Sequence, residues 1–302
     1  MTPSVLLSAA TAAAVAAVAV RQAESAIRVR PERRRVVDDA EAGAMATAMS
    51  AEWEPATVES ADGLSLRGWF FLPRAWNGRA VLALHGFTDS RRGMLYHVRM
   101  LLRAGFAVLA PDSRGHGSSE GELVSFGIHE SRDVPLWGDW LLARLGLDRY
   151  CALGASMGAA VLLQCLPEEP RIEALVADAP FSRFDDVAYE RFAGRAGVTP
   201  TIARTLLRPI VSTAWRYIRL RYGIDLRLVR PIEAMRRATK PVLLIHGSGD
   251  PAIPTRHSLE LHQANPSHSQ LWVVEGARHV DAVRVEPGEY ERRVISVFGA
   301  PA

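Results

Sequence analysis

The chain has 302 residues, of which 48% are hydrophobic and 23% are charged, and it contains two cysteines. This composition is that of an ordinary globular protein with enough apolar material for one large core, so it excludes a collagen, a disulfide scaffold and a wholly disordered chain. The net charge of +3 is too small by itself to indicate a nucleic-acid binder.

The first apolar stretch runs from Val5 to Val20 and is dominated by Ala and Val. As a helix it would measure about 24 Å, less than the roughly 30 Å hydrocarbon core of a bilayer. Residues 1–20 are therefore predicted to form a marginal membrane segment, with an amphipathic or disordered leader as the alternative. The arginines that follow would keep the remaining chain on the cytoplasmic side. Without the anchor, we expect a soluble cytoplasmic protein.

Residues 21–56 are predicted to be a linker, because acidic and small residues occur there without a sustained strand pattern. Helix-forming residues lie between Ala40 and Met49. Residues 57–60 and 64–72 are then predicted to form a hairpin, since the intervening Ala-Asp-Gly supplies turn geometry.

Short apolar runs alternate with helical patterns over the rest of the chain. The runs are 80–84, 107–110, 150–153, 174–177, 242–245 and 271–274, and the helical patterns are 94–104, 129–145, 157–166, 257–264 and 287–297. This order predicts an α/β fold with a mostly parallel, twisted sheet, helices on both faces and reactive residues at the carboxyl ends of the strands. Residues 181–237 interrupt the alternation, and we expect them to form a helical cap.

Gly154, Ser156 and Gly158 form a Gly-x-Ser-x-Gly pattern between a predicted strand and a predicted helix. That setting is typical of a nucleophile elbow, in which a strained serine lies where strand and helix come so close that only small neighbours fit. A serine hydroxyl becomes an effective nucleophile when an imidazole takes its proton. The sequence therefore predicts Ser156 as a nucleophile that needs a histidine.

His279 is the predicted base, because it lies in a loop directly after the last apolar run. The rival histidines lie within or before the preceding helix and strand: His246, His257, His262 and His268. Asp250, which follows the run 242–245, is the predicted orienting acid, and Asp178 at the end of an earlier run is the alternative. The chain order is then Ser156, Asp250, His279.

With these motifs the sequence resembles the α/β-hydrolase superfamily from about residue 57 to about residue 299. The stretches Leu84-His-Gly-Phe-Thr-Asp, Asp112-Ser-Arg-Gly-His-Gly-Ser-Ser and His246-Gly-Ser-Gly-Asp-Pro-Ala-Ile-Pro are similar to turns in serine aminopeptidase-like and monoacylglycerol-lipase-like members. The resemblance implies a hydrolase domain at 57–300 with its cap at 181–237. It also implies that the backbone N–H groups of Phe87 and Met157 form an oxyanion hole.

Other polar residues near these motifs are expected to have structural roles. His85 and His116 are predicted to hold backbone turns, and Asp112 and Arg114 are predicted to form a pair that fixes a loop. No histidine, aspartate and glutamate cluster has the spacing of a metal site, and no cofactor is expected. Cys151 and Cys165 are predicted to be buried free thiols.

The cap region is strongly basic, since residues 183–237 hold twelve arginines and five acidic residues. This charge is expected either to be a solvated surface or to attract anionic substrates or lipid headgroups. Within the cap, Trp215 and Tyr217 are candidates to line an acyl pocket.

The sequence therefore predicts a serine hydrolase that cleaves carboxylic esters through an acyl-enzyme on Ser156. A serine peptidase, a thioesterase and an acyltransferase are alternatives that use the same triad. Two alternatives are not enzymes: a silent α/β-hydrolase that binds a ligand through its cap, and a membrane-tethered scaffold. The expected partner is a small ester or acyl compound, with membrane contact through residues 5–20 as a further expectation and no nucleic acid.

Overall fold

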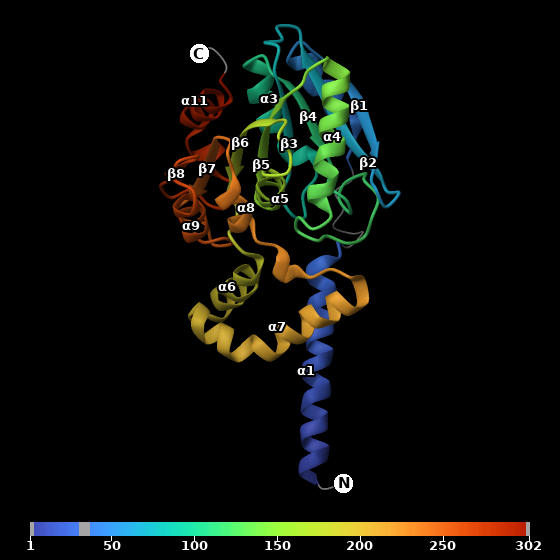
Figure 1. Cartoon of the computed structure of the whole chain (residues 1–302), viewed down its shortest axis with the longest axis vertical. Coiled ribbons are helices and arrows are strands. Elements are labelled where there is room, and N and C mark those ends of the chain that lie inside the picture. The colour runs from blue at the N-terminus through green and yellow to red at the C-terminus, as the bar shows by residue number, and fades with distance from the viewer. Residues whose placement is uncertain (1–2, 30–36, 300–302) are drawn as a thin grey trace.

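The computed structural model describes residues 3–29 and 37–299 (Figure 1). Its centre is an eight-stranded sheet with the strand order β1-β2-β4-β3-β5-β6-β7-β8. The strands are β1 (Ala51–Glu59), β2 (Ser65–Pro73), β3 (Ala80–Leu84), β4 (Ala107–Pro111), β5 (Tyr150–Ala155), β6 (Ile172–Asp178), β7 (Val242–Gly247) and β8 (Ser269–Val274). The pairs β1·β2 and β2·β4 are antiparallel and all the others are parallel, which confirms the predicted fold class.

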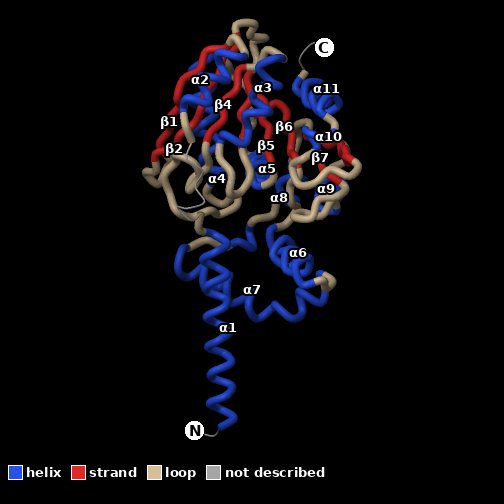
Figure 2. The backbone as a smooth tube through the Cα atoms, turned by 180° about the vertical axis from the view of Figure 1, so that it is seen from behind, coloured by secondary structure: helices blue, strands red, loops and turns tan. Residues whose placement is uncertain are grey.

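Helices cover both faces of the sheet (Figure 2). Those of the body are α2 (Asp39–Ala48), η2 (Arg91–Met94), α3 (Leu95–Arg103), α4 (Glu130–Leu145), α5 (Met157–Cys165), α8 (Pro231–Arg237), α9 (Arg256–Ala264), α10 (Ala282–Val285) and α11 (Pro287–Phe298). In β3, Leu82 packs in the core on the side of α4 and α5, while its neighbours Val81 and Ala83 pack on the side of α3 and α11. Successive side chains point to opposite faces of a strand, so a strand buried on both faces is apolar throughout.

The region predicted as a linker is more ordered than expected. α2 and the first six residues of β1 both lie within residues 21–56, and β1 pairs with β2 from Ala51 onward. The prediction missed the start of this strand because β1 is an edge strand in which only Ala56 is buried. Its sequence therefore carries little apolar alternation.

Between β6 and β7 the chain forms α6 (Phe184–Ala196), α7 (Pro200–Tyr222), η3 (Leu226–Leu228) and α8. Figure 1 shows α6 and α7 on the side of the body from which α1 (Pro3–Ile27) projects. Pro209 lies inside α7, where it removes a backbone hydrogen bond and bends the helix. α8 packs instead against α5 and α9, so the cap proper consists of α6, α7 and η3.

α1 packs against α7 through its second half. Ala19, Ala23 and Ile27 are buried there at intervals of four residues, which places them on one helix face. The prediction of a membrane segment in residues 1–20 finds no support, since no helix in the described parts of the chain is long and apolar enough to cross a membrane.

A polar contact fixes the end of α1. Glu24 accepts hydrogen bonds from the hydroxyls of Tyr217 (2.7 Å) and Tyr222 (2.5 Å), both in α7. Arg28 pairs at 2.6 Å with Glu24 and at 2.6 Å with Glu122, which lies in the loop before α4. α1 therefore ties the cap to the body.

Candidate active site

Ser156 lies in the turn between β5 and α5 with φ 52° and ψ −110°, a backbone conformation that costs a non-glycine residue about 1–3 kcal/mol. The surrounding glycines make this turn possible. A Cβ at Gly154 would lie 2.5 Å from the backbone nitrogen of Ala159, and one at Gly158 would lie 2.4 Å from the carbonyl oxygen of Leu84. No side chain fits at either position without moving backbone.

The structure brings Ser156, His279 and Asp250 together from the ends of three strands. His279 Nε2 lies 2.8 Å from Ser156 Oγ, and His279 Nδ1 lies 2.6 Å from Asp250 Oδ2. When Nδ1 carries the ring proton, Nδ1–H donates a hydrogen bond to the carboxylate of Asp250, and the lone pair on Nε2 accepts a hydrogen bond from the hydroxyl of Ser156. This arrangement can pass a proton from Ser156 to His279.

Asp250 is buried but well supplied with donors. Its Oδ1 accepts hydrogen bonds from the N–H groups of Ala252 (2.7 Å) and Ile253 (2.9 Å), and His246 Nε2 lies 3.4 Å from its Oδ2. Burial raises the pKa of Asp250, but the bonds to His246 and His279 outweigh burial and hold that pKa well below its usual range. Asp250 is therefore a carboxylate at neutral pH.

The loop after β3 passes directly beside the serine. A Cβ at Gly86 would lie 3.3 Å from the Cβ of Ser156, so the N–H of Phe87 follows the point of closest approach. Met157 is the first residue of α5, where N–H groups have no partner within the helix. The N–H of Ser156 itself donates to the carbonyl of Asp178 (2.7 Å). Phe87 and Met157 are thus the two candidate oxyanion donors.

Two buried histidines hold this loop. His85 Nε2 accepts the N–H of Ser113 (3.0 Å), and His116 Nε2 accepts the N–H of Thr88 (3.3 Å), as the predicted turn-holding role requires. Burial lowers the pKa of His116 to about 4, so the ring is neutral and can accept.

The predicted pairing of Asp112 with Arg114 is wrong. Asp112 instead binds the guanidinium of Arg91 (2.6 Å), while Arg114 reaches Asp133 in α4 (2.7 Å) and Asp62 (2.9 Å). The partners of Asp112 and Arg114 all lie in other parts of the chain, so their closeness in the sequence did not indicate whom they bind.

The side chains of the alternative acid and bases have other partners than Ser156 and His279. Asp178 Oδ2 accepts a hydrogen bond from Tyr290 (3.1 Å), and its own burial raises the pKa of Asp178 to about 6. The rival histidines bind other groups: His246 binds Ser258 and Ile253, His257 binds Glu190 and Ser182, His262 binds Ser269 and His268 binds Asn265. Among the four histidines, His246 alone approaches the triad, where it supports Asp250. Asp178 contacts Ser156 through its backbone carbonyl.

Neither of the predicted acyl-pocket residues has a contact with the triad among the described interactions. The hydroxyl of Tyr217 donates to Glu24, and Trp215 lines a cavity of the cap whose lining contains no triad residue. In the described parts of the chain, no cluster of three or more potential ligands can hold a metal ion. Cys151 and Cys165 are buried and free, as predicted.

An aromatic cluster that was not predicted from the sequence lies beside the loop after β3. The ring of Phe87 is 5.2 Å from that of Phe126, which is 4.2 Å from Phe184 at the start of α6, and Phe181 is 5.8 Å from Phe184. The Phe-Ser-Arg-Phe stretch at 181–184 was its signal in the sequence. The cluster joins the loop after β3 to the start of the cap by apolar contacts.

Comparisons with known proteins give a consistent family. A profile of the Alpha/beta hydrolase family matches residues 80–293, which is more than half of the chain. Over 240 residues the chain is 27% identical to the uncharacterized protein YqkD of Bacillus subtilis, with 78% of this chain and 76% of YqkD covered. It is 28% identical to the lysophosphatidylserine lipase ABHD12 of Mus musculus, with 77% of this chain and 55% of that protein covered.

A solved structure is also similar. The Pyrococcus furiosus esterase Pf2001 superposes with a TM-score of 0.69 and 25% sequence identity, over 88% of this chain and 97% of the esterase. The profile match contains all three residues that the structure brings together.

The elbow yields a prediction about stability. Gly158→Ala places a Cβ against the backbone of β3, and we expect it to lower the free energy of unfolding by about 3 kcal/mol or more, in the range of overpacked cores. Gly288→Ala, which meets no atom within 4 Å, is the matched control and should change stability by less than about 1 kcal/mol. Urea unfolding of both variants measures this, and equal effects would contradict the close approach.

Asp178 yields a prediction about pH. Its folded pKa of about 6 exceeds the 3.8 of a free aspartate, so the stability from holding the proton is fully present below pH 3.8 and is lost as pH rises through 6. The free energy of unfolding of Asp178→Asn, measured relative to that of wild type, should therefore rise by on the order of 2 kcal/mol from about pH 4 to about pH 7.5. Urea unfolding at both pH values checks this. A stability difference that does not vary with pH would contradict the raised pKa.

Proposed function

The chain belongs to the Alpha/beta hydrolase family, and on that basis we propose that it is a serine hydrolase that cleaves carboxylic esters through an acyl-enzyme on Ser156. The observation that carries the proposal is the continuous hydrogen-bonded path from Ser156 Oγ through His279 to Asp250. This path supplies a base and a fixed imidazole orientation to a serine already held in a strained turn.

In the proposed mechanism, Ser156 Oγ attacks the ester carbonyl while its proton passes to His279 Nε2. Asp250 stabilises the imidazolium without taking its proton. The N–H groups of Phe87 and Met157 bind the oxyanion, and loss of one such donor costs about 3 kcal/mol of barrier. The intermediate then expels the alcohol, which receives the proton from His279. Water, activated by the same imidazole, releases the acid and restores the serine.

Two similarities support an ester as the bond cleaved. Pf2001 is named an esterase and ABHD12 a lysophosphatidylserine lipase, and both names describe ester-cleaving enzymes. Phe87 and Phe184, the partly exposed members of the aromatic cluster, add a surface on which an apolar acyl chain can lie near the serine, and the buried rings of Phe126 and Phe181 pack beneath them. A carboxylic ester with an apolar acyl group fits both observations.

The nucleophile is tested directly with a fluorophosphonate probe and 4-nitrophenyl esters. Ser156→Ala should abolish labelling, and Asp250→Asn should lower kcat by about 10⁴-fold because it frees the imidazole to adopt the wrong tautomer. Ser296→Ala, an exposed serine in α11, is the control and should label like wild type. Labelling that persists in Ser156→Ala, or folded wild type that neither labels nor cleaves esters, would refute the proposal.

The acyl site is tested by chain length. Phe184→Ala removes a ring stacked on Phe126, so we expect kcat/KM for an eight-carbon acyl ester to fall by about tenfold while that for the acetyl ester changes by less than about twofold. Leu259→Ala, at an exposed apolar residue of α9, should leave both esters unaffected. An equal loss for the two chain lengths would place the acyl group elsewhere.

A further inference from the structure

The cap contains a cavity of about 760 Å³ between α6, α7 and η3. Its lining consists of Tyr189, Arg208, Ser212, Thr213, Trp215, Arg216, Arg219, Leu220 and Arg227. Five of the α7 residues (208, 212, 215, 216 and 219) follow helical spacing, so they lie on one face of the helix. One face of α7 therefore supplies much of the lining.

This cavity carries more arginines than carboxylates that could neutralise them. Four arginines line it, and the described lining residues include no carboxylate. Asp225 lies nearby and serves two of them, at 2.6 Å from Arg227 and 3.7 Å from Arg219. Arg208 and Arg216 form no ion pair with any carboxylate that the structure describes.

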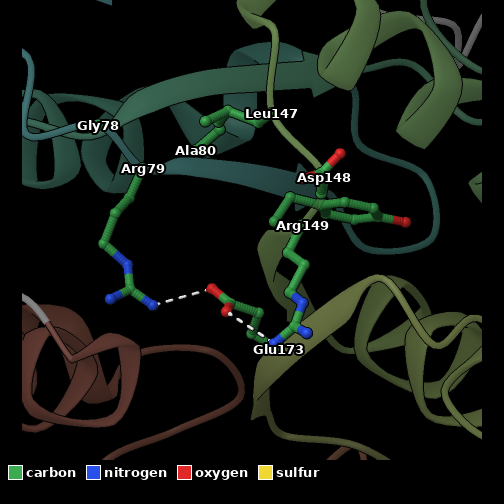
Figure 3. A pocket seen from close by; sticks show the side chains of 8 residues that line it. Gly78, Arg79, Ala80, Leu147, Asp148, Arg149 and Glu173 are labelled. Atoms are coloured by element: carbon green, nitrogen blue, oxygen red, sulfur yellow. Dashed lines mark hydrogen bonds and ion pairs between the residues drawn. The ribbon is translucent and has the colours of Figure 1, made fainter.

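A second cavity shows what a compensated site looks like. At the opposite edge of the sheet, a cavity of about 440 Å³ is also lined by arginines, Arg79 and Arg149. Figure 3 shows both directed toward Glu173, at 2.9 Å and 3.9 Å. That carboxylate already occupies the position an anion would take. The cap cavity lacks such an internal anion among its described lining residues.

The remaining lining of the cap cavity matches an anion carried on an apolar group. A guanidinium group can donate two parallel N–H hydrogen bonds to two oxygens of one phosphate. The hydroxyls of Ser212 and Thr213 can donate to a further oxygen. Trp215 and the exposed Leu220 supply apolar contact on the same lining. Phosphate and apolar chain are the two halves of an anionic amphiphile.

We propose that the cap cavity is a binding site for the phosphate headgroup of an amphiphile. Arg208 and Arg216 supply the uncompensated charge, and Trp215 contacts the adjoining apolar part. The inference deepens the proposed function, on which it rests for one point: if the chain is an esterase, its preferred substrates are esters that carry a phosphate.

Binding is tested in full-length protein with Ser156→Ala, so that no turnover occurs. Isothermal titration should show that dodecyl phosphate binds at least about tenfold more tightly than dodecyl maltoside, its uncharged counterpart, or inorganic phosphate. Adding Arg208→Gln and Arg216→Gln should weaken dodecyl phosphate by at least about tenfold. Adding Arg149→Gln and Arg284→Gln, which removes the same charge at exposed sites outside the cap, should change it by less than about twofold.

Each other outcome overturns the proposal. Equal binding of dodecyl phosphate and dodecyl maltoside would make the cavity an apolar site only. Equal binding of inorganic phosphate would assign it to a free anion. If the Arg149 and Arg284 changes weaken dodecyl phosphate binding as much as the Arg208 and Arg216 changes do, net charge and not the cavity attracts the ligand. Thermal melting of both double variants establishes that they are folded.

Turnover separates this inference from the proposed function. In the protein with Ser156 intact, 1-oleoyl lysophosphatidic acid and 1-monooleoylglycerol differ by one phosphate. The Arg208 and Arg216 changes should lower kcat/KM for the first by at least about tenfold and for the second by less than about twofold. If no ester is hydrolysed but dodecyl phosphate still binds in the way expected above, the hydrolase is refuted and the anion site is retained. Equal loss for both esters would overturn the anion site.

Discussion

At Ser156 the backbone holds a φ of 52° in a turn whose close packing depends on two glycines: Gly154 lets β5 approach α5, and Gly158 lets α5 approach the end of β3. The strain of about 1–3 kcal/mol is offset by buried surroundings and by the bond from Ser156 N–H to the carbonyl of Asp178. This one turn fixes the rest of the site. It aims the hydroxyl at His279, places Met157 at the start of α5, and lets the loop after β3 pass directly alongside.

The parallel sheet brings together site residues that lie far apart in the sequence. Ser156 and His279 are separated by 123 residues, yet both follow strands whose carboxyl ends meet at one edge of the sheet. Asp250 follows β7, which lies between β6 and β8. Burial alone would favour its neutral form, and the surrounding imidazoles and backbone N–H groups reverse that preference. The charge that orients His279 is thus maintained by contacts that also close the loop after β7.

The sequence predicted features that depend on local pattern. β3 was predicted at its observed bounds because its five residues are all buried, whereas the start of β1 was missed because that edge strand buries only Ala56. The Gly-x-Ser-x-Gly motif and the order of the strands predicted Ser156, Asp250 and His279, and the structure places these three residues in hydrogen-bond contact. The pairing of Arg91 with Asp112 and the contact of Glu24 with Tyr217 join residues 21 and 193 positions apart. No periodicity or motif marks such contacts, because they arise only when separate elements pack.

Those long-range contacts bear on the cap cavity. Glu24 holds α7 to α1, and Glu190 of α6 is held to α9 by His257 at 2.7 Å and by Arg256 at 2.7 Å. Repulsion among four arginines would spread the cap open if only those charges acted on it. Fixed contacts at both of its helices resist that opening, so the cavity exists before any anion enters. A site formed in advance loses less ordering entropy on binding, and the self-repulsion that a bound anion relieves then adds to its affinity.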